Sequence, residues 1–284
     1  MSAVEWILIG SSGGALGAWL RTVLRDECVA KGIAPWHALL SINIIGSALA
    51  GWVSASAHDE WLRVLVLTGF LGGLTTLSGM CLDTFVQWRS GRRWTAAGIA
   101  IGTLVGGPIA CGVAAVAGAP ISPTMGATAC AAIAPTAGSL RGRRLAHHGG
   151  GLALIALGGA AGSSLRITAD LLGHANQLAP WLSTAAVNMC GSLLAGWAYQ
   201  WLSAIDHLGR PRHAHSKRLR LERLLIFGFA GGLTTMSALA VEVLSAWDQD
   251  PFEALMIASV NGVLGLAAVI VGWNLAVRLR PVSS

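Results

Sequence analysis

Charged residues are scarce in this chain. Only 11% of its 284 residues are charged and 54% are apolar, whereas a soluble domain carries roughly 25% charged residues. This scarcity excludes a soluble globular protein and predicts an integral membrane protein in a lipid bilayer. The net charge of +6 is better explained by basic loops that set membrane topology than by nucleic-acid binding. We therefore expect no nucleic-acid partner.

Motifs for catalysis and for metal binding are missing as well. The five cysteines form no CxxC pair and have no metal-site spacing with histidine, so we expect neither a disulfide framework nor a Cys/His metal centre. The sequence has no HExxH motif, no Walker phosphate-binding loop and no pair of aspartates inside an apolar segment. We expect that the protein is not an enzyme.

One stretch stands out because the chain uses it twice. Residues 69–78 read GFLGGLTTLS and residues 228–237 read GFAGGLTTMS, each inside an apolar segment long enough to cross a membrane. Paired glycines favour a break in the backbone. A membrane tolerates such a break only where protein buries it or a polar cavity adjoins it. The duplication predicts a site near the bilayer midplane, shared by two halves of the chain.

Two further motifs repeat in the same order. Residues 158–166 match residues 13–21 at an offset of 145, and the segment around Asn188 matches the segment around Asn43 at the same offset. Each half holds four apolar segments, so we expect two four-helix repeats, residues 1–118 and residues 149–284. Within the second repeat, the polar and basic residues 206–223 are expected to form a loop.

The connection between the halves, residues 119–148, has two interpretations. Residues 94–140 contain no charged residue and no histidine. A stretch of this length can cross the membrane twice. The prolines in residues 119–140 leave an exposed linker as the alternative. Seven of the 19 basic residues belong to the first half, six on one side of the membrane and one on the other. The other twelve belong to the second half, eleven on one side and one on the other, and the order of the segments reverses the two sides between the halves. We predict inverted repeats joined by a crossing linker helix, nine transmembrane helices, an outer N-terminus and a cytoplasmic C-terminus.

Polar side chains lie at fixed places in these repeats. Asn43 and Asn188 lie in the middle of apolar segments, where an unpaired amide is costly. Each therefore either holds helices together or lines a pore. The hydroxyls beside the breaks either bond back to their own helix or face a polar cavity. They belong to Thr75, Thr76, Ser78, Thr234, Thr235 and Ser237.

Charged side chains near the breaks also have two interpretations each. Arg21 and Arg166 end the first segment of each half, and they either snorkel to the membrane surface or form a vestibule that attracts anions. Asp83 and Glu242 follow the breaks, and they either carry protons or pair with a basic residue near a helix end. Carbonyl groups freed by the breaks are potential ligands of a small hard cation.

These motifs resemble those of the Fluc (CrcB) family of fluoride channels. The family has a GGxxGAxxR-like first helix, a VNxxGSxxxG second helix and a GFxGGxTTFSTFxxE-like broken third helix, and this chain has all three, in order, in both halves. The resemblance covers most of the chain. It implies an all-α integral membrane protein formed by a fused pair of channel domains. Such a chain would act as a monomer and export cytoplasmic fluoride passively through the plasma (inner) membrane.

The resemblance also implies roles for particular residues. It implies Asn43 and Asn188 as pore donors, and a structural sodium ion bound between the repeats by the backbone carbonyls of Gly72, Thr75, Gly231 and Thr234. The positions of the family's pore phenylalanines hold Leu77, Met80, Met236 and Leu239 here. Leucine lacks the positive ring edge that faces an anion. With the hydroxyls of Thr76, Ser78, Thr235 and Ser237 as the remaining lining, we expect a wetter and less fluoride-selective pore.

Two other functions fit the same fold. A proton-coupled transporter of a different small solute would need a titrating group such as Asp83 or Glu242. A non-conducting membrane scaffold would need no such group. Fluoride flux and its dependence on protons separate the three functions.

Overall fold

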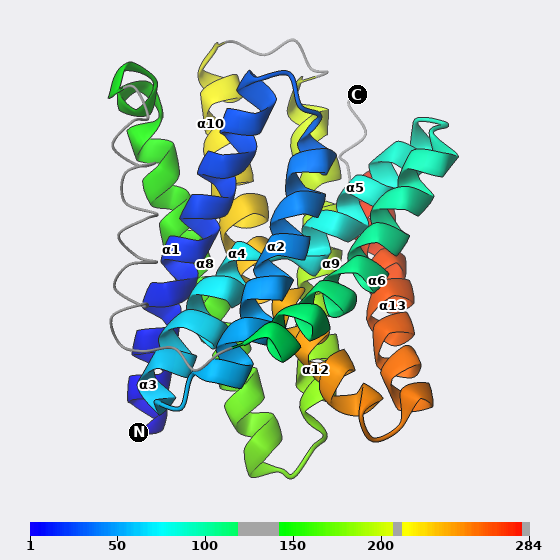
Figure 1. Ribbon diagram of the computed structural model, residues 1–284. Coiled ribbons are helices and arrows are strands. Elements are labelled where there is room, and N and C mark those ends of the chain that lie inside the picture. The colour runs from blue at the N-terminus through cyan, green and yellow to red at the C-terminus, as the bar shows by residue number, and fades with distance from the viewer. Residues whose placement is uncertain (119–141, 207–211, 280–284) are drawn as a thin grey trace.

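A bundle of long helices forms the part of the chain that the computed structural model describes, residues 1–118, 142–206 and 212–279 (Figure 1). These residues contain no β-strand. Seven of their helices are long and apolar enough to cross a membrane, which confirms the expectation of an all-α integral membrane protein. The count of nine transmembrane helices stays a prediction, because most of the predicted linker helix lies outside the described residues.

The first half follows the predicted segments closely. Ser2 and Glu5 form a capping box at the start of the first helix, and Pro35 occupies the first turn of the second. The third segment is interrupted at Thr75 and Thr76, as the glycine-threonine motif predicts. The elements are α1 (Ala3–Ala30), α2 (Pro35–Ser56), α3 (Glu60–Leu62), η1 (Arg63–Leu71), α4 (Gly72–Leu74), α5 (Leu77–Arg89) and α6 (Arg93–Ala117).

The second half repeats this order, with a second interruption between Leu233 and Ser237. Pro180 begins the helix after the first turn of this half, and Asp250 caps the last helix with its side chain. The elements are α8 (Gly142–Ala175), α9 (Pro180–Asp206), α10 (Arg212–Glu222), η2 (Arg223–Ala230), α11 (Gly231–Leu233), α12 (Ser237–Trp247) and α13 (Pro251–Arg278).

Two boundaries differ from the prediction. The predicted loop 206–223 is wrong for its second part, because Arg212–Glu222 forms α10 and continues directly into η2. A continuous helix satisfies its own backbone groups, which a loop would leave to other partners. Similarly, α8 begins at Gly142, before residue 149, where the second repeat was predicted to begin.

Both broken segments contain a feature that the hydropathy pattern does not predict. Each break is preceded by a π-helical stretch, Arg63–Leu71 in the first half and Arg223–Ala230 in the second. π-helical turns are rare and occur frequently at functional sites. The two stretches widen the helix next to the break in both halves.

Small residues bring the two halves together along α1 and α8. These two helices pack against each other over much of their length. A side chain at Gly10 would overlap Ile167, and one at Gly14 would overlap Ser163. Glycine at these positions therefore permits the close backbone approach that is typical of helices in membranes.

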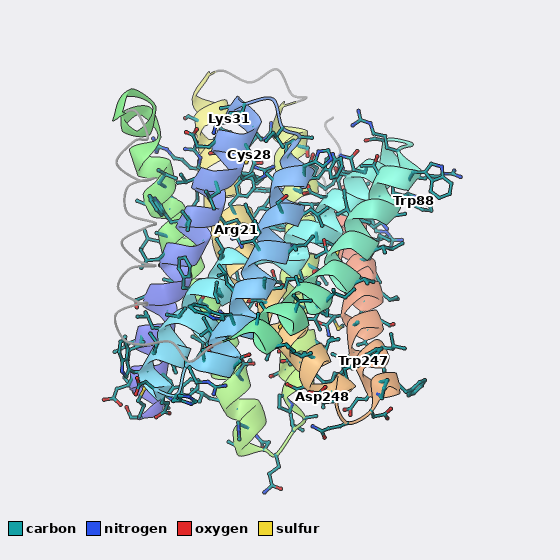
Figure 2. All side chains as sticks on the ribbon, in the orientation of Figure 1. Arg21, Cys28, Lys31, Trp88, Trp247 and Asp248 are labelled. Carbon is teal, nitrogen blue, oxygen red and sulfur yellow. The ribbon has the colours of Figure 1, made fainter. Side chains whose placement is uncertain are left out.

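Equivalent helices of the two halves run in opposite directions. In Figure 1, α1 rises from the lower end of the molecule, whereas α8 descends from the upper end. Trp88, at the end of α5, lies at the upper end of Figure 2, and Trp247, at the end of α12, lies at the lower end. Which end faces the cytoplasm stays a prediction.

Candidate ion pathways at two broken helices

The breaks leave peptide groups without helical partners in the middle of the protein. Thr75 and Thr76 are extended, with φ/ψ of −97°/153° and −151°/130°, and Thr234 is extended with φ/ψ of −94°/149°. The N–H groups of Thr75 and Thr234 still bond to Leu71 O and Ala230 O, at 3.0 and 3.1 Å, but the extended backbone takes the peptides that follow them out of the helical pattern. Because all three threonines are buried, other groups must satisfy the freed donors and acceptors.

In each half an asparagine satisfies one of these peptides. The Thr76 N–H donates to Asn43 Oδ1 at 3.0 Å, and Asn43 Nδ2 donates to Thr76 O at 3.0 Å. In the second half the Thr235 N–H donates to Asn188 Oδ1 at 2.9 Å, and Asn188 Nδ2 donates to Thr235 O at 3.3 Å. The two asparagines therefore connect the second helix of each half to its break. This contact accounts for one N–H of each amide, and pore lining by the asparagines stays a prediction.

The two breaks also cap each other. The Thr75 hydroxyl accepts hydrogen bonds from the N–H groups of Met236 and Ser237, at 3.2 and 2.9 Å, in the first turn of α12. The Thr234 hydroxyl accepts one from the N–H of Ser78 at 3.3 Å and lies 2.8 Å from the Thr76 hydroxyl. Each half thus supplies a capping group to the broken helix of the other, which couples the two breaks into one polar cluster.

The other hydroxyls of the cluster cap their own helices. Thr76 Oγ1 accepts from the Gly79 N–H at 3.3 Å, and Thr235 Oγ1 accepts from the Ala238 N–H at 3.2 Å. Ser78 Oγ lies 2.9 Å from the Thr234 hydroxyl. The hydroxyls predicted to line a pore therefore take part in capping and in contacts between the halves, and their role in a pore stays a prediction.

Arg21 and Arg166 bind the carbonyl groups at the ends of the broken helices. Arg21 Nη1 donates to Gly73 O at 2.9 Å and to Gly231 O at 3.0 Å, and its Nη2 donates to Phe227 O at 2.6 Å. Arg166 Nη2 donates to Thr68 O at 2.8 Å. A helix end carries partial negative charge on its carbonyls, so the two guanidinium groups stabilise it and tie each half to the break of the other.

These arginine contacts bear on the sodium ion implied by the family resemblance. The carbonyl of Gly231, one of its four expected ligands, already accepts from Arg21. A side chain at Gly72 would meet Arg166 Nη2 at 2.6 Å, so the second guanidinium lies beside another expected ligand. Like charges so close together are unfavourable, so the guanidinium groups compete with a cation at Gly72 and Gly231, and the sodium ion at Gly72, Thr75, Gly231 and Thr234 stays a prediction. No step below depends on one.

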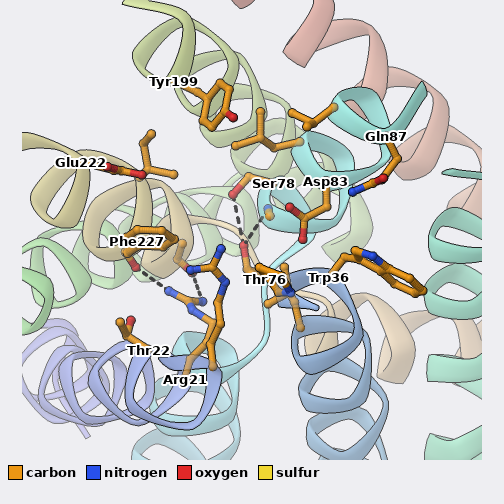
Figure 3. Close-up of a pocket in the computed structure, with 18 residues that line it drawn as sticks. Arg21, Thr22, Trp36, Thr76, Ser78, Asp83, Gln87, Tyr199, Glu222 and Phe227 are labelled. Carbon is orange, nitrogen blue, oxygen red and sulfur yellow. Dashed lines mark hydrogen bonds between the residues drawn. The ribbon is translucent and has the colours of Figure 1, made fainter. Parts of the chain in front are cut away.

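Each arginine also lines a pocket that we call a vestibule. The first vestibule (Figure 3) is lined by Arg21, Arg25, Trp36, Asp83, Tyr199 and Glu222, among others. The second is lined by Thr68, Arg166, Asp170, His174, Thr184 and Glu242, among others. The structure therefore brings each predicted vestibule arginine together with the carboxylate that follows a break. Within the described residues, neither carboxylate forms an ion pair with an arginine.

The four residues at the phenylalanine positions are all buried. Leu77, Met236 and Leu239 are 0% exposed and Met80 is 2% exposed. The break of each half packs against the other half, because α12 contacts α2 and α6, while α5 contacts α9 and α13. A side chain at Gly107 of α6 would meet Met236 Cε at 3.0 Å. We call the groups around Asn43 on α2 and α6, with α12 of the other half, the first pathway. The groups around Asn188 on α9 and α13, with α5 of the other half, are the second pathway, so each is built from both halves.

The sequence analysis missed one polar residue in the last helix of each half. Thr103 and Asn261 are buried, with 0% and 1% of their surface exposed. Each lies four residues before a glycine, Gly107 or Gly265, that approaches the second helix of its half. This shared spacing, a polar residue followed by glycine one turn later, was the signal in the sequence. The signal was missed because the sequences of α6 and α13 repeat only weakly.

Comparison with known proteins identifies the family of the chain. A family model described as CrcB-like protein, Camphor Resistance (CrcB), matches twice, at residues 8–118 and 153–273. The chain belongs to the CrcB family. The two matches cover both halves in turn and leave out the connection between them, which agrees with a fused pair of CrcB domains.

Curated relatives each match about a third of the chain. A fluoride-specific ion channel FluC of Xanthomonas axonopodis pv. citri is 35% identical over 102 residues, which is 32% of this chain and 76% of the relative. A protein with the same name from Bordetella pertussis is 40% identical over 108 residues, or 36% of this chain and 82% of the relative. The name describes an ion channel and not an enzyme, in agreement with the sequence analysis. No solved structure matched the chain.

Proposed function

We propose that this chain is a passive fluoride channel that exports cytoplasmic fluoride through the plasma (inner) membrane. The observation that carries the proposal is the pair of asparagines, Asn43 and Asn188, each bonded to the peptide beside a break. They stand where the family resemblance implies pore donors. The CrcB match over both halves and the name of the curated relatives support the same function.

The physics of fluoride suits such a channel. Hydrogen fluoride crosses a membrane as a neutral molecule and dissociates in a near-neutral cytoplasm, where the anion is trapped. A membrane potential that is negative inside drives the anion outward with about 2.3 kcal/mol per charge per 100 mV. An exporter therefore needs a selective pore and no energy source of its own.

The proposal includes an arrangement in the membrane. The N-terminus lies outside and the C-terminus in the cytoplasm, as the distribution of basic residues predicts. The two halves pair with each other inside one chain, as their mutual capping suggests, so the functional unit is a monomer in a lipid bilayer.

Fluoride efflux from proteoliposomes tests this function. Purified protein in liposomes loaded with potassium fluoride should release fluoride when valinomycin carries potassium out, and protein-free liposomes should not. A passive channel releases fluoride equally well with or without a proton gradient. Efflux that requires a proton gradient would favour the coupled transporter, and no efflux from a monodisperse protein would favour the non-conducting scaffold.

A further inference from the structure

The two candidate pathways differ at one buried position. On α13, Asn261 Oδ1 accepts a hydrogen bond from Asn188 Nδ2 at 2.8 Å, and Asn261 Nδ2 donates to Ile257 O at 3.0 Å. The equivalent residue on α6 is Thr103. The equivalence follows from the next turn of each helix, where a side chain at Gly107 would meet Ser47 Oγ at 3.3 Å and one at Gly265 would meet Ser192 Oγ at 3.5 Å.

This difference leaves hydrogen-bond donors available in the first pathway. An amide nitrogen carries two N–H donors, and Asn43 Nδ2 makes one hydrogen bond within the described residues, to Thr76 O. The hydroxyls of Ser47 and Thr103 have no hydrogen-bond partner there, although both residues are 0% exposed. Buried polar groups are normally bonded, so three unused donors around one place indicate a site for a ligand that accepts hydrogen bonds.

The second pathway lacks this set of donors. Asn188 Nδ2 donates to Thr235 O and to Asn261 Oδ1, which uses both of its N–H groups. The side-chain oxygen of Asn261 faces that amide, and an oxygen acceptor repels an anion. Of the three equivalent groups, the hydroxyl of Ser192 alone has no partner within the described residues.

The two vestibules also differ in the charged residues that line them. At the offset of 145, Arg25 of the first vestibule is replaced by Asp170 in the second. Thr184 replaces Leu39 at the same offset, and its hydroxyl donates to Glu242 Oε1 at 2.5 Å. The first vestibule balances Arg21 and Arg25 against Asp83 and Glu222. The second sets Arg166, beside His174, against Asp170 and Glu242, so it holds one arginine where the first holds two.

We propose that the two pathways are unequal and that fluoride passes through the first alone. This inference rests on the proposed function. In the first pathway the dehydrated anion accepts hydrogen bonds from the amide of Asn43 and the hydroxyls of Ser47 and Thr103. These bonds replace the water that a small anion loses in a low-dielectric pore. In the second pathway the hydrogen bond between Asn188 and Asn261 occupies the equivalent place and, with a vestibule that holds one arginine fewer, excludes anions.

A matched pair of substitutions tests the inequality. Ser47→Ala and Ser192→Ala remove equivalent hydroxyls from the two pathways, and Thr103→Val removes the other hydroxyl of the first pathway with little change in shape. In the proteoliposome efflux assay, Ser47→Ala and Thr103→Val should each lower the initial rate of fluoride efflux about tenfold, the effect of roughly one lost hydrogen bond. Ser192→Ala should leave the rate unchanged.

Other outcomes of this comparison overturn the inference. Equal losses in Ser47→Ala and Ser192→Ala would mean that both pathways conduct, and unchanged efflux in Ser47→Ala and Thr103→Val would mean that the first pathway does not bind fluoride as proposed. If the unmodified chain releases no fluoride, the proposed function itself fails. Size-exclusion profiles establish that each compared variant is folded.

A gain of function provides a second test that does not depend on damaging the protein. Asn261→Thr combined with Asp170→Arg gives the second pathway the residues of the first at these two positions. In a Thr103→Val background this pair should restore fluoride efflux to within about twofold of the unmodified chain. A folded variant whose efflux stays at the Thr103→Val level would show that these two residues do not close the second pathway.

Discussion

At the scale of single residues, the two asparagines share a structural task and differ in the functional one. Each carboxamide pairs with the N–H and the C=O of a buried residue beside a break, so both asparagines are needed for stability. The second N–H of the two amides differs, because that of Asn188 donates to Asn261 Oδ1 and that of Asn43 has no such partner within the described residues. Stability and conduction should therefore respond differently to substitution.

Substitution of each asparagine by serine separates the two tasks. Asn43→Ser and Asn188→Ser should both lower the free energy of unfolding, by roughly 1–3 kcal/mol, because each leaves buried peptide groups unpaired. Thermal unfolding in detergent measures this change. Fluoride efflux should fall strongly in Asn43→Ser and persist in Asn188→Ser. A folded Asn188→Ser protein without efflux would contradict the unequal pathways.

The absent phenylalanines make a second prediction at this scale. Met236→Phe with Leu239→Phe should raise the ratio of fluoride to chloride permeability, because the positive ring edge favours the anion, and α12 packs beside the first pathway. Leu77→Phe with Met80→Phe is the matched control beside the second pathway and should leave the ratio unchanged. Overpacking against Gly107 should cost about 1–3 kcal/mol of stability. An unchanged ratio in the variant with Met236→Phe and Leu239→Phe would refute the role of the rings, and an equal rise in the control would contradict the unequal pathways.

At the scale of helices, the broken segments were predictable and their surroundings were not. The repeated glycine-threonine motif located both breaks, because a glycine pair followed by a threonine pair inside an apolar run is typical of an interrupted helix. The π-helical stretches and α10 were missed, since hydropathy does not separate one type of helix turn from another. Thr103 and Asn261 were missed because the last helix repeats weakly between the halves, so their shared spacing to Gly107 and Gly265 was not recognised.

The arginines leave no room for a side chain at two glycines of the breaks, Gly72 and Gly231. Gly231→Ala would place a methyl group in the guanidinium of Arg21, and Gly72→Ala would place one 2.6 Å from Arg166 Nη2. Both variants should lose yield of monodisperse protein and several degrees of thermal stability. Gly98→Ala on α6 is the control, because no atom lies within 4 Å of a side chain there, and it should be neutral or slightly stabilising. Equal stability of all three variants would contradict the arginine contacts.

The same arginine contacts predict how the channel responds to sodium. If the guanidinium groups of Arg21 and Arg166 hold the carbonyls of the breaks together, fluoride efflux should be unchanged when all sodium is replaced by N-methylglucamine during purification and assay. A structural sodium ion, as the family resemblance implies, predicts loss of efflux or of monodisperse protein instead. Readdition of sodium that restores either property would count against the arginine account.

At the scale of the whole molecule, the opposed directions of the two halves predict an inverted topology. Ser90 and Gln249 are exposed residues in the equivalent turns that follow α5 and α12. Single cysteines at these positions, in a background without the five native cysteines, should react with a membrane-impermeant reagent from opposite sides of the membrane. We expect Ser90→Cys on the cytoplasmic side. Labelling of both from one side would exclude inverted repeats.

The measurement that tests the central claim most directly is the reversal potential of the current carried by the purified chain in a lipid bilayer. A passive fluoride channel predicts a reversal potential that follows the fluoride gradient, by about 59 mV for each tenfold ratio, and that does not move when a proton gradient is added. A reversal potential that moves with the proton gradient at a fixed fluoride ratio, or the absence of any fluoride-dependent current from folded protein, would contradict this account.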